Sequence, residues 1–151
     1  MIVAIKKLND AAVIPTQGSQ FAAGYDLYAN EGAIIPPGKT MIIGTGVAIS
    51  IPGFYYGAIF ARSGMATKRG LRPANCVGVI DSDYRGEIMV ALHNDSDTEQ
   101  KIEPRDRIAQ IVFMPYVTVD FIESESLSDT KRGNGGFGST GTTLEPIDYD
   151  L

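Results

Sequence analysis

Short apolar runs separated by glycine- and proline-containing turns dominate most of this chain. The clearest run covers residues 40–51, where Val47, Ile49 and Ile51 alternate with other residues and so share one face of an extended strand. The dipeptide Pro52-Gly53 then predicts a turn before the next run. We find no amphipathic pattern as long as a typical helix of about 11 residues. Many short strands joined by such turns predict an all-β sandwich, jelly roll or barrel.

The length and composition suit one soluble domain. The chain has 151 residues, of which 44% are hydrophobic, and this is enough for a sizeable core. No apolar run approaches the roughly 18 residues of a membrane-spanning helix, so no membrane partner is expected. The N-terminal segment lacks the basic and long apolar regions of a secretory signal. We therefore predict a cytoplasmic protein, or a nuclear or host-cytosol one if the source is eukaryotic or viral.

Cysteine and histidine, which often build reactive or metal sites, each occur once in the chain, as Cys76 and His93. Cys76 lies in an apolar, strand-like run, which predicts a buried and inert thiol. A nucleophilic role is less favoured because no histidine lies close in sequence. His93 follows an apolar run and is interpreted as a surface residue at a strand end. One cysteine and one histidine cannot build a Cys/His zinc site.

The charge distribution favours a small anionic ligand over a long polyanion. The net charge is −5, so stable nucleic-acid binding is not expected. The cations are nevertheless grouped, in three clusters: Arg62, Lys68, Arg69 and Arg72; Arg105 and Arg107; and Lys131 and Arg132. Local basic groups on an acidic protein suit a compact anion. The alternative is that these residues are ordinary solvated surface charges. This explanation is at least as good as ligand binding for Lys68, Arg69, Arg72 and Arg105.

The stretch at residues 77–88, V-G-V-I-D-S-D-Y-R-G-E-I, predicts a β-hairpin. Two apolar runs flank a polar segment rich in turn-forming Asp, Ser and Gly. Asp81, Asp83 and Tyr84 on one hairpin would lie at fixed distances and build a pocket. The alternative is an ordinary turn, since acidic residues are common in loops.

The composition changes after residue 121. Residues 123–131 are polar and predict an exposed connector, and residues 132–141, R-G-N-G-G-F-G-S-T-G, are rich in glycine. Glycine amides, Arg132 and the hydroxyls of Ser139 and Thr140 suit phosphate oxygens, and Phe137 suits a base. A segment of this kind can close over a nucleotide, whereas a disordered tail is the alternative. It is not a Walker A loop, because it contains no G-K-[ST].

Five short segments, spread along the chain, carry combinations of aspartate, glycine, arginine and aromatic residues that occur together in one family. They are A-G-Y-D-L-Y-A (23–29), A-R-S-G-M-A-T-K-R-G-L (61–71), G-V-I-D-S-D-Y-R-G-E-I (78–88), R-I-A-Q-I-V-F-M-P (107–115) and R-G-N-G-G-F-G-S-T-G (132–141). In this order and spacing the chain resembles the trimeric dUTP diphosphatases (dUTPases). The departures are Ala61, where the family often has proline, and Lys68-Arg69-Gly70, where Lys-His-Gly is frequent.

The resemblance implies an all-β, jelly-roll-like barrel and a homotrimer with three active sites at subunit interfaces. Residues 1–122 would form the barrel, and residues 123–151 a connector and mobile arm that completes a site built by the other two subunits. The reaction implied is hydrolysis of dUTP to dUMP and pyrophosphate, with Mg²⁺ on the triphosphate. It would limit uracil incorporation into DNA and supply dUMP for thymidylate synthesis.

The resemblance also implies roles around the nucleoside. Asp81 would be the catalytic base that holds the attacking water, takes its proton and accepts from the 3′-hydroxyl. Tyr84 would pack on the sugar at C2′, where a 2′-hydroxyl would clash, and so reject ribonucleotides. The uracil edge would pair with main-chain groups around Val79, Ile80 and Met89, whose fixed pattern of donors and acceptors suits uracil rather than cytosine.

Further roles concern the phosphates and the base. Arg62, Ser63 and Gly64 would grip phosphates, and Gln110 would be a neutral donor toward the α-phosphate or the water; an outward polar residue of a buried strand is the alternative for Gln110. Asn75 would lie near the base, with a simple turn residue as the alternative.

The remaining implied roles belong to residues of the fifth segment (132–141) and of the first segment (23–29). Arg132, Gly138 and Ser139 would hold the γ-phosphate, and Phe137 would stack over uracil. Asp26 would face the hydration shell of Mg²⁺, which keeps several waters in such sites. A structural role for Asp26, such as capping or pairing with an arginine, is an equal alternative.

Two other functions compete with dUTP hydrolysis. A dCTP deaminase-like enzyme shares the jelly roll and trimer but resembles this chain less in the glycine-rich arm. A non-catalytic, nucleotide-switched interaction protein would keep the pocket without the reaction. A plain β-sandwich binding module would explain the strands but not the five ordered motifs.

Overall fold

Short antiparallel strands build this chain, whose computed structural model describes residues 1–139 and 141. The strands are β1 (Ala4–Lys7), β2 (Thr16–Gln17), β3 (Tyr25–Tyr28), β4 (Ala33–Ile35), β5 (Thr40–Gly44), β6 (Val47–Ser50), β7 (Tyr55–Phe60), β8 (Leu71–Pro73), β9 (Gly78–Ile80), β10 (Met89–Asn94), β11 (Gln100–Ile102) and β12 (Arg107–Pro115). Within the described residues the one helix is α1 (Ser63–Arg69), which ends at Gly70 in the left-handed conformation that glycine favours. The predicted all-β class is confirmed.

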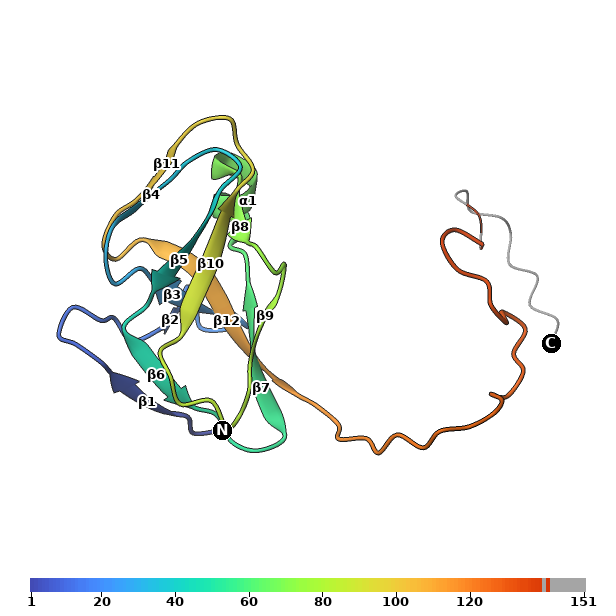
Figure 1. Cartoon of the computed structure of the whole chain (residues 1–151). Coiled ribbons are helices and arrows are strands. Elements are labelled where there is room, and N and C mark those ends of the chain that lie inside the picture. Colours follow the sequence, from blue (N-terminus) through green and yellow to red (C-terminus); the bar gives the residue numbers. More distant parts are fainter. Residues whose placement is uncertain (140, 142–151) are drawn as a thin grey trace. The chain divides into compact units, whose positions relative to one another are not determined.

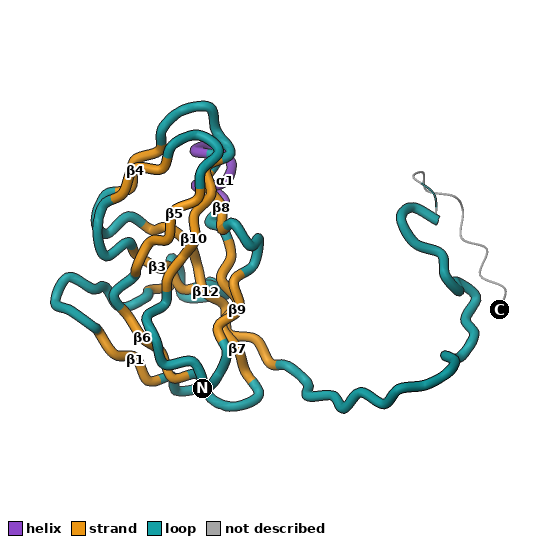
Figure 2. Tube along the Cα trace, in the orientation of Figure 1, coloured by secondary structure: helices purple, strands orange, loops and turns teal. Residues whose placement is uncertain are grey.

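In the part of the chain that the structure describes, the strands form four sheets, and every pairing is antiparallel. The largest sheet has the order β2-β3-β12-β7-β9, and a second has the order β5-β10-β8. Two further pairs, β1-β6 and β11-β4, complete the set. Figure 1 shows these strands wrapped around a common interior within residues Met1–Thr118, and Figure 2 shows the loops that join them.

The interior is aliphatic and joins the two larger sheets. Leu27 of β3 and Ile111 of β12 are fully buried, and Leu92 of β10 is fully buried against the same core. Full burial of one such side chain contributes about 1.5–3 kcal/mol. The shared core therefore fixes both sheets, and with them the loops that begin and end at their strands.

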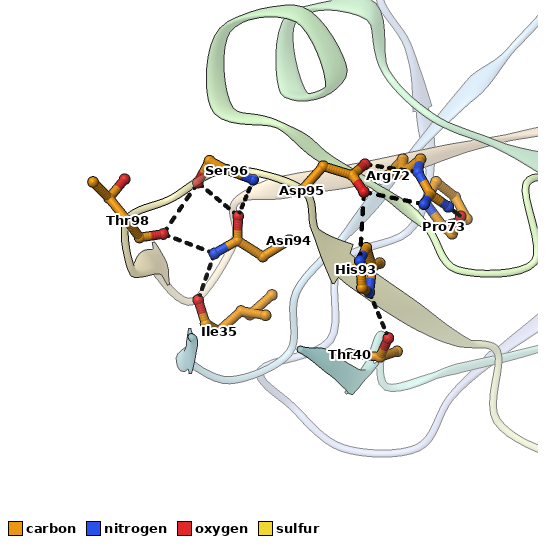
Figure 3. Close-up of polar contacts among 9 residues, drawn as sticks. All are labelled: Ile35, Thr40, Arg72, Pro73, His93, Asn94, Asp95, Ser96 and Thr98. Atoms are coloured by element: carbon orange, nitrogen blue, oxygen red, sulfur yellow. Dashed lines mark hydrogen bonds and ion pairs between the residues drawn. The ribbon is translucent and has the colours of Figure 1, made fainter. Parts of the chain in front are cut away.

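One polar side chain inside this core has its hydrogen bonds satisfied. Asn94 is 0% exposed at the end of β10. Its Nδ2 donates to the carbonyl of Ile35 at 2.9 Å and to that of Thr98 at 2.8 Å, and its Oδ1 accepts from the amide and hydroxyl of Ser96 (Figure 3). The amide thus pairs both donors and its acceptor, as burial requires. It ties β10 to β4 and closes the turn that follows.

A second set of polar side chains connects the three strands of the β5-β10-β8 sheet, with Thr40 on β5, His93 on β10 and Arg72 on β8. His93 lies next to the end of β10, as predicted, with Nδ1 2.9 Å from the Thr40 hydroxyl and Nε2 3.4 Å from Asp95 (Figure 3). Arg72 donates to both oxygens of the same carboxylate, at 2.7 and 3.1 Å. The hydrogen bond to Asp95 raises the pKa of Arg72 above its ordinary value.

The prediction of a buried thiol is wrong, because Cys76 is exposed. The apolar run that contains it starts with a tight turn rather than a strand. The Cys76 amide donates to the Pro73 carbonyl at 3.1 Å, the Val77 amide donates to the Asn75 carbonyl at 2.6 Å, and Cys76 has φ of 62°. This curled backbone turns the side chain toward solvent, and the strand begins only at Gly78.

Residues Val119–Leu151 form a second unit. Its described part, residues 119–139 and 141, contains no strand or helix: residues 119–130 are mostly irregular, and bends and turns gather in residues 131–139. Among all described residues, no helix combines the length and apolar character that a membrane span requires.

Candidate active site

The loop between β9 and β10 carries Asp81 and Tyr84. β9 pairs with β7, whereas β10 pairs with β5 and β8, so the two arms belong to different sheets. The predicted hairpin with mutually paired arms is therefore wrong in its pairing. Since β9 and β10 are not paired with each other, no ladder of hydrogen bonds closes the space between them.

The space between the two arms contains a cavity of about 170 Å³. Its lining residues are Val79, Ile80, Asp81, Tyr84, Glu87 and Met89. A cavity of about 150 Å³ is known to accept benzene, so this one matches a single six-membered ring. Of the predicted nucleoside residues, the structure thus brings together the catalytic candidate, the sugar-packing tyrosine and the three base-pairing positions. We call it the ring cavity.

The loop holds its own shape around the ring cavity. The Tyr84 amide donates to the Asp81 carbonyl at 3.2 Å, and the Tyr84 hydroxyl donates to the Glu87 carbonyl at 3.0 Å. The Arg85 guanidinium donates to the carbonyls of Ser82 and Tyr84, at 2.6 and 2.9 Å. Asp81 itself is exposed at this turn, so its carboxylate is accessible to water and ligand.

A second cavity, of about 410 Å³, lies beside the start of α1. Its lining residues are Gly18, Ala22, Gly24, Asp26, Arg62, Ser63, Gly64, Arg107 and Gln110. We call it the arginine cavity. The strand register explains the grouping, because Gln110 of β12 lies opposite both Asp26 of β3 and Phe60 of β7. The four phosphate-binding residues predicted within Met1–Thr118, namely Arg62, Ser63, Gly64 and Gln110, therefore lie on one cavity surface.

Asp26 joins the two arginines of this cavity. Its Oδ1 lies 2.7 Å from Arg62 Nε, and its Oδ2 lies 3.4 Å from Arg107 Nη1. The carboxylate is nearly buried, whereas both guanidinium groups are more exposed. Two cations share one anion, so the cavity keeps a surplus positive charge suited to phosphate. This pairing matches the structural alternative for Asp26.

Gln110 is held in a fixed orientation. Its Nε2 donates to the Ala61 carbonyl at 3.0 Å, just before the phosphate-gripping residues predicted from the sequence. Its Oε1 lies against Gly24, where an added Cβ would be only 2.4 Å away. Only glycine therefore leaves room for this side chain, and the amide stays at the wall of the cavity.

The donor set does not fit a resident metal ion. Both Asp26 oxygens already face guanidinium groups. Among the described residues, no group of three or more His, Cys, Asp or Glu side chains is arranged to hold a metal. Contact through water molecules would be the remaining route by which Asp26 meets a cation.

One predicted site residue within Met1–Thr118, Asn75, lines neither cavity. It is exposed in the turn before β9. Glu87 was assigned no role from the sequence, and Arg107 was noted only as part of a cation cluster suited to a compact anion, although both lie within the quoted motifs. Nothing in their spacing signals the distant partners that they contact, Gly46 and Asp26 respectively.

The glycine-rich segment of the second unit forms a series of local turns. Arg132 Nε donates to the Gly135 carbonyl at 2.8 Å, and the Ser139 amide donates to the Gly136 carbonyl at 3.1 Å. Phe137 is fully exposed, with φ of 48°, and Gly138 has φ of 93°. Thr140, the second hydroxyl predicted from the sequence, lies outside the described residues, as do residues 142–151.

Comparison with known proteins identifies relatives over nearly the whole chain. The dUTPase family model matches residues 10–141. The deoxyuridine 5′-triphosphate nucleotidohydrolase of Nautilia profundicola is 51% identical over 141 residues, covering 93% of this chain and 99% of that protein.

Solved structures of the same kind match the fold. The dUTPase of Staphylococcus bacteriophage 80alpha with dUPNHPP superposes with a TM-score of 0.87 at 30% identity, covering 93% of this chain and 98% of the other. The structure of a mutant dUTPase of phage phi11 of S. aureus, which reveals details of the coordination of a structural Mg(II) ion, matches with a TM-score of 0.77 at 26% identity, covering 83% of this chain and 98% of the other.

Proposed function

Because the chain belongs to the dUTPase family, we propose that it hydrolyses dUTP to dUMP and pyrophosphate. This reaction keeps uracil out of DNA and supplies dUMP for thymidylate synthesis. The observation that carries the proposal is the ring cavity, which places Asp81 and Tyr84 around a space the size of one pyrimidine.

Uracil binds in the ring cavity through main-chain groups. Since β9 and β10 pair with other strands, the cleft between Ile80 and Met89 is open to a ligand. The uracil O4 acceptor and N3–H donor suit one fixed pattern of main-chain groups, which cytosine inverts. The methyl group of thymine would collide with the wall formed by Val79 and its neighbours.

Asp81 acts as the general base, and Tyr84 selects the deoxyribose by sterically excluding a 2′-hydroxyl. The Asp81 carboxylate holds a water against the α-phosphorus and takes its proton while the water oxygen bonds to phosphorus. The bond from phosphorus to the bridging oxygen breaks, and pyrophosphate leaves. The Tyr84 ring packs at C2′ of the deoxyribose, so a 2′-hydroxyl clashes with it.

The arginine cavity binds the triphosphate. Arg62 and Arg107 supply positive charge, Ser63 and Gly64 contact phosphate oxygens, and Gln110 donates to the α-phosphate or to the water. Mg²⁺ on the triphosphate would enter with the substrate as Mg·dUTP and would neutralise part of the phosphate charge. Asp26 would face the water molecules around Mg²⁺ and not the ion itself, because both of its carboxylate oxygens are paired with arginines.

The active site combines three subunits of a homotrimer. Residues 1–122 form the catalytic barrel, and residues 123–151 form the arm. The arm contributes Arg132, Gly138 and Ser139 to the γ-phosphate and stacks Phe137 on uracil. Two observations support this arrangement: the ring and arginine cavities share no lining residue, and the glycine-rich segment belongs to a separate unit.

Asn75 has a weaker claim to the site. We keep it near the base of the bound nucleotide, although it lines neither cavity in the single chain. We further propose that the enzyme works in the cytoplasm, or in the nucleus or host cytosol if its source is eukaryotic or viral.

Pyrophosphate release from dUTP, UTP, dTTP and dCTP, measured side by side, tests the function. We expect rapid release from dUTP and little from the other three. Ammonia release from dCTP would support the deaminase alternative instead. Nucleotide binding without release from any of the four would support a nucleotide-switched interaction protein.

A further inference from the structure

Glu87 links the Asp81–Tyr84 loop to a distant turn. Its Oε1 accepts a hydrogen bond from the Gly46 amide at 2.7 Å, across 41 positions of sequence. In the described chain, this bond is the one by which a side chain of the loop between β9 and β10 reaches a remote segment. The loop is therefore anchored by a side chain as well as by the strand pairings of β9 and β10 at its two ends.

The same turn also holds the residue after Glu87. The amide and hydroxyl of Thr45 both donate to the Ile88 carbonyl, at 3.2 and 2.6 Å. The Ile88 amide donates in turn to the Val47 carbonyl at 2.8 Å. Thr45 and Ile88 are both buried, so these bonds are shielded from water. The exit arm of the loop is thus clamped to the turn between β5 and β6.

The turn is shaped to receive the Glu87 carboxylate. A Cβ added at Gly44 would lie 2.6 Å from Glu87 Oε1, so only glycine leaves space for the side chain there. Gly46 has φ of 69°, a conformation that favours glycine, and this conformation directs its amide to the carboxylate. A flexible surface contact would not need such a fit on both sides.

Tyr84 rests directly on this anchored segment. Its hydroxyl donates to the Glu87 carbonyl at 3.0 Å, and its ring lies over Gly86, where an added Cβ would be 2.4 Å from the hydroxyl oxygen. The position of the Glu87 backbone therefore sets the position of the Tyr84 ring at the edge of the ring cavity.

We propose that Glu87 is a positioning residue that holds Tyr84 at the sugar and thereby sets the preference for deoxyribonucleotides. This inference rests on the proposed dUTP hydrolysis. Glu87 takes no part in the proton transfer. Its carboxylate acts as a hydrogen-bond acceptor toward Gly46, so a neutral acceptor of the same length is expected to replace it.

The test compares Glu87→Ala, Glu87→Asp and Glu87→Gln with a control, Glu99→Ala, which removes an exposed glutamate between β10 and β11. For each variant, kcat and KM are measured with dUTP and UTP, well below the thermal unfolding midpoint. We expect Glu87→Ala and Glu87→Asp to reduce the preference for dUTP over UTP by about tenfold, as a shift of the ring by a fraction of 1 Å would. The change should come mainly from KM.

Glu87→Gln should keep the preference within about fivefold of wild type, because a neutral amide oxygen forms the same bond at roughly half the strength. Glu99→Ala should match wild type. A lowered unfolding midpoint in Glu87→Ala with an unchanged preference for dUTP would overturn the proposal in favour of a purely structural role.

Two further outcomes would also overturn it. One is a Glu87→Gln variant as unselective as Glu87→Ala. The other is failure of both the Ala and Asp variants to fold while the Gln variant keeps full selectivity, since Glu87 would then act on folding. If the wild-type protein does not hydrolyse dUTP, the proposed function fails first, and this result is distinct from all of the others.

Discussion

Gly24→Ala is expected to disable Gln110 without unfolding the protein. The added methyl group would lie 2.4 Å from Gln110 Oε1, whereas ordinary contact begins at 3.4 Å. The amide must therefore move by about 1 Å, and it leaves its hydrogen bond to the Ala61 carbonyl. The far end of a flexible side chain moves easily, so most of the cost should fall on the site rather than on the fold.

The magnitudes follow from these contacts. Loss of one neutral hydrogen bond lowers the free energy of unfolding by about 1 kcal/mol. A misplacement of about 1 Å at a group that positions phosphate lowers kcat by about 10²-fold. Pyrophosphate release gives kcat, and thermal unfolding gives stability. Gly53→Ala is the matched control, because a Cβ at Gly53 meets nothing within 4 Å.

A double-mutant cycle isolates the cause. In a Gln110→Ala background the methyl group at position 24 has no amide to displace, so Gly24→Ala should cost almost nothing further in kcat. Equal losses in both backgrounds would refute the reasoning, as would a Gly24→Ala enzyme with wild-type kcat.

Three other changes have definite expected outcomes. Asp81→Asn should retain affinity for a dUTP analogue but lower turnover by about 10²–10⁴-fold, the usual contribution of a positioned base; equal losses of affinity and rate would assign Asp81 a structural role. Truncation after Lys131 should leave the fold and assembly unchanged, by circular dichroism and gel filtration, yet abolish most hydrolysis; full activity would remove the arm from the mechanism. Asn94→Ala should lower the free energy of unfolding by about 2–4 kcal/mol, because the carbonyls of Ile35 and Thr98 lose buried donors; denaturation showing a change under 1 kcal/mol would contradict this.

The parts of the fold that depend on local patterns were predictable. The run over residues 40–51 is extended as predicted, but a turn at Thr45 and Gly46 divides it into β5 and β6, and the dipeptide Pro52-Gly53 precedes β7 as expected. Cys76 was misjudged because its apolar neighbours suggested a strand, whereas a positive φ curls the chain there. Strand partners are set by long-range pairing, which explains why β9 and β10 were wrongly expected to pair with each other.

The candidate site shows the same division. Asp81 and Tyr84 lie close in sequence, so their joint position at one cavity could be predicted. The contacts of Asp26 with Arg62 and Arg107 bring together three separate strands and loops, and sequence spacing contains no distance of this kind. The need for glycine at position 24 becomes visible only when the neighbouring strand is in place.

A crystal structure with a non-hydrolysable dUTP analogue tests the central claim most directly. We predict that the uracil ring lies in the ring cavity between β9 and β10, with its edge bonded to main-chain groups and the Asp81 carboxylate directed at the α-phosphate. A nucleotide bound elsewhere, with Asp81 facing away from it, would contradict the account.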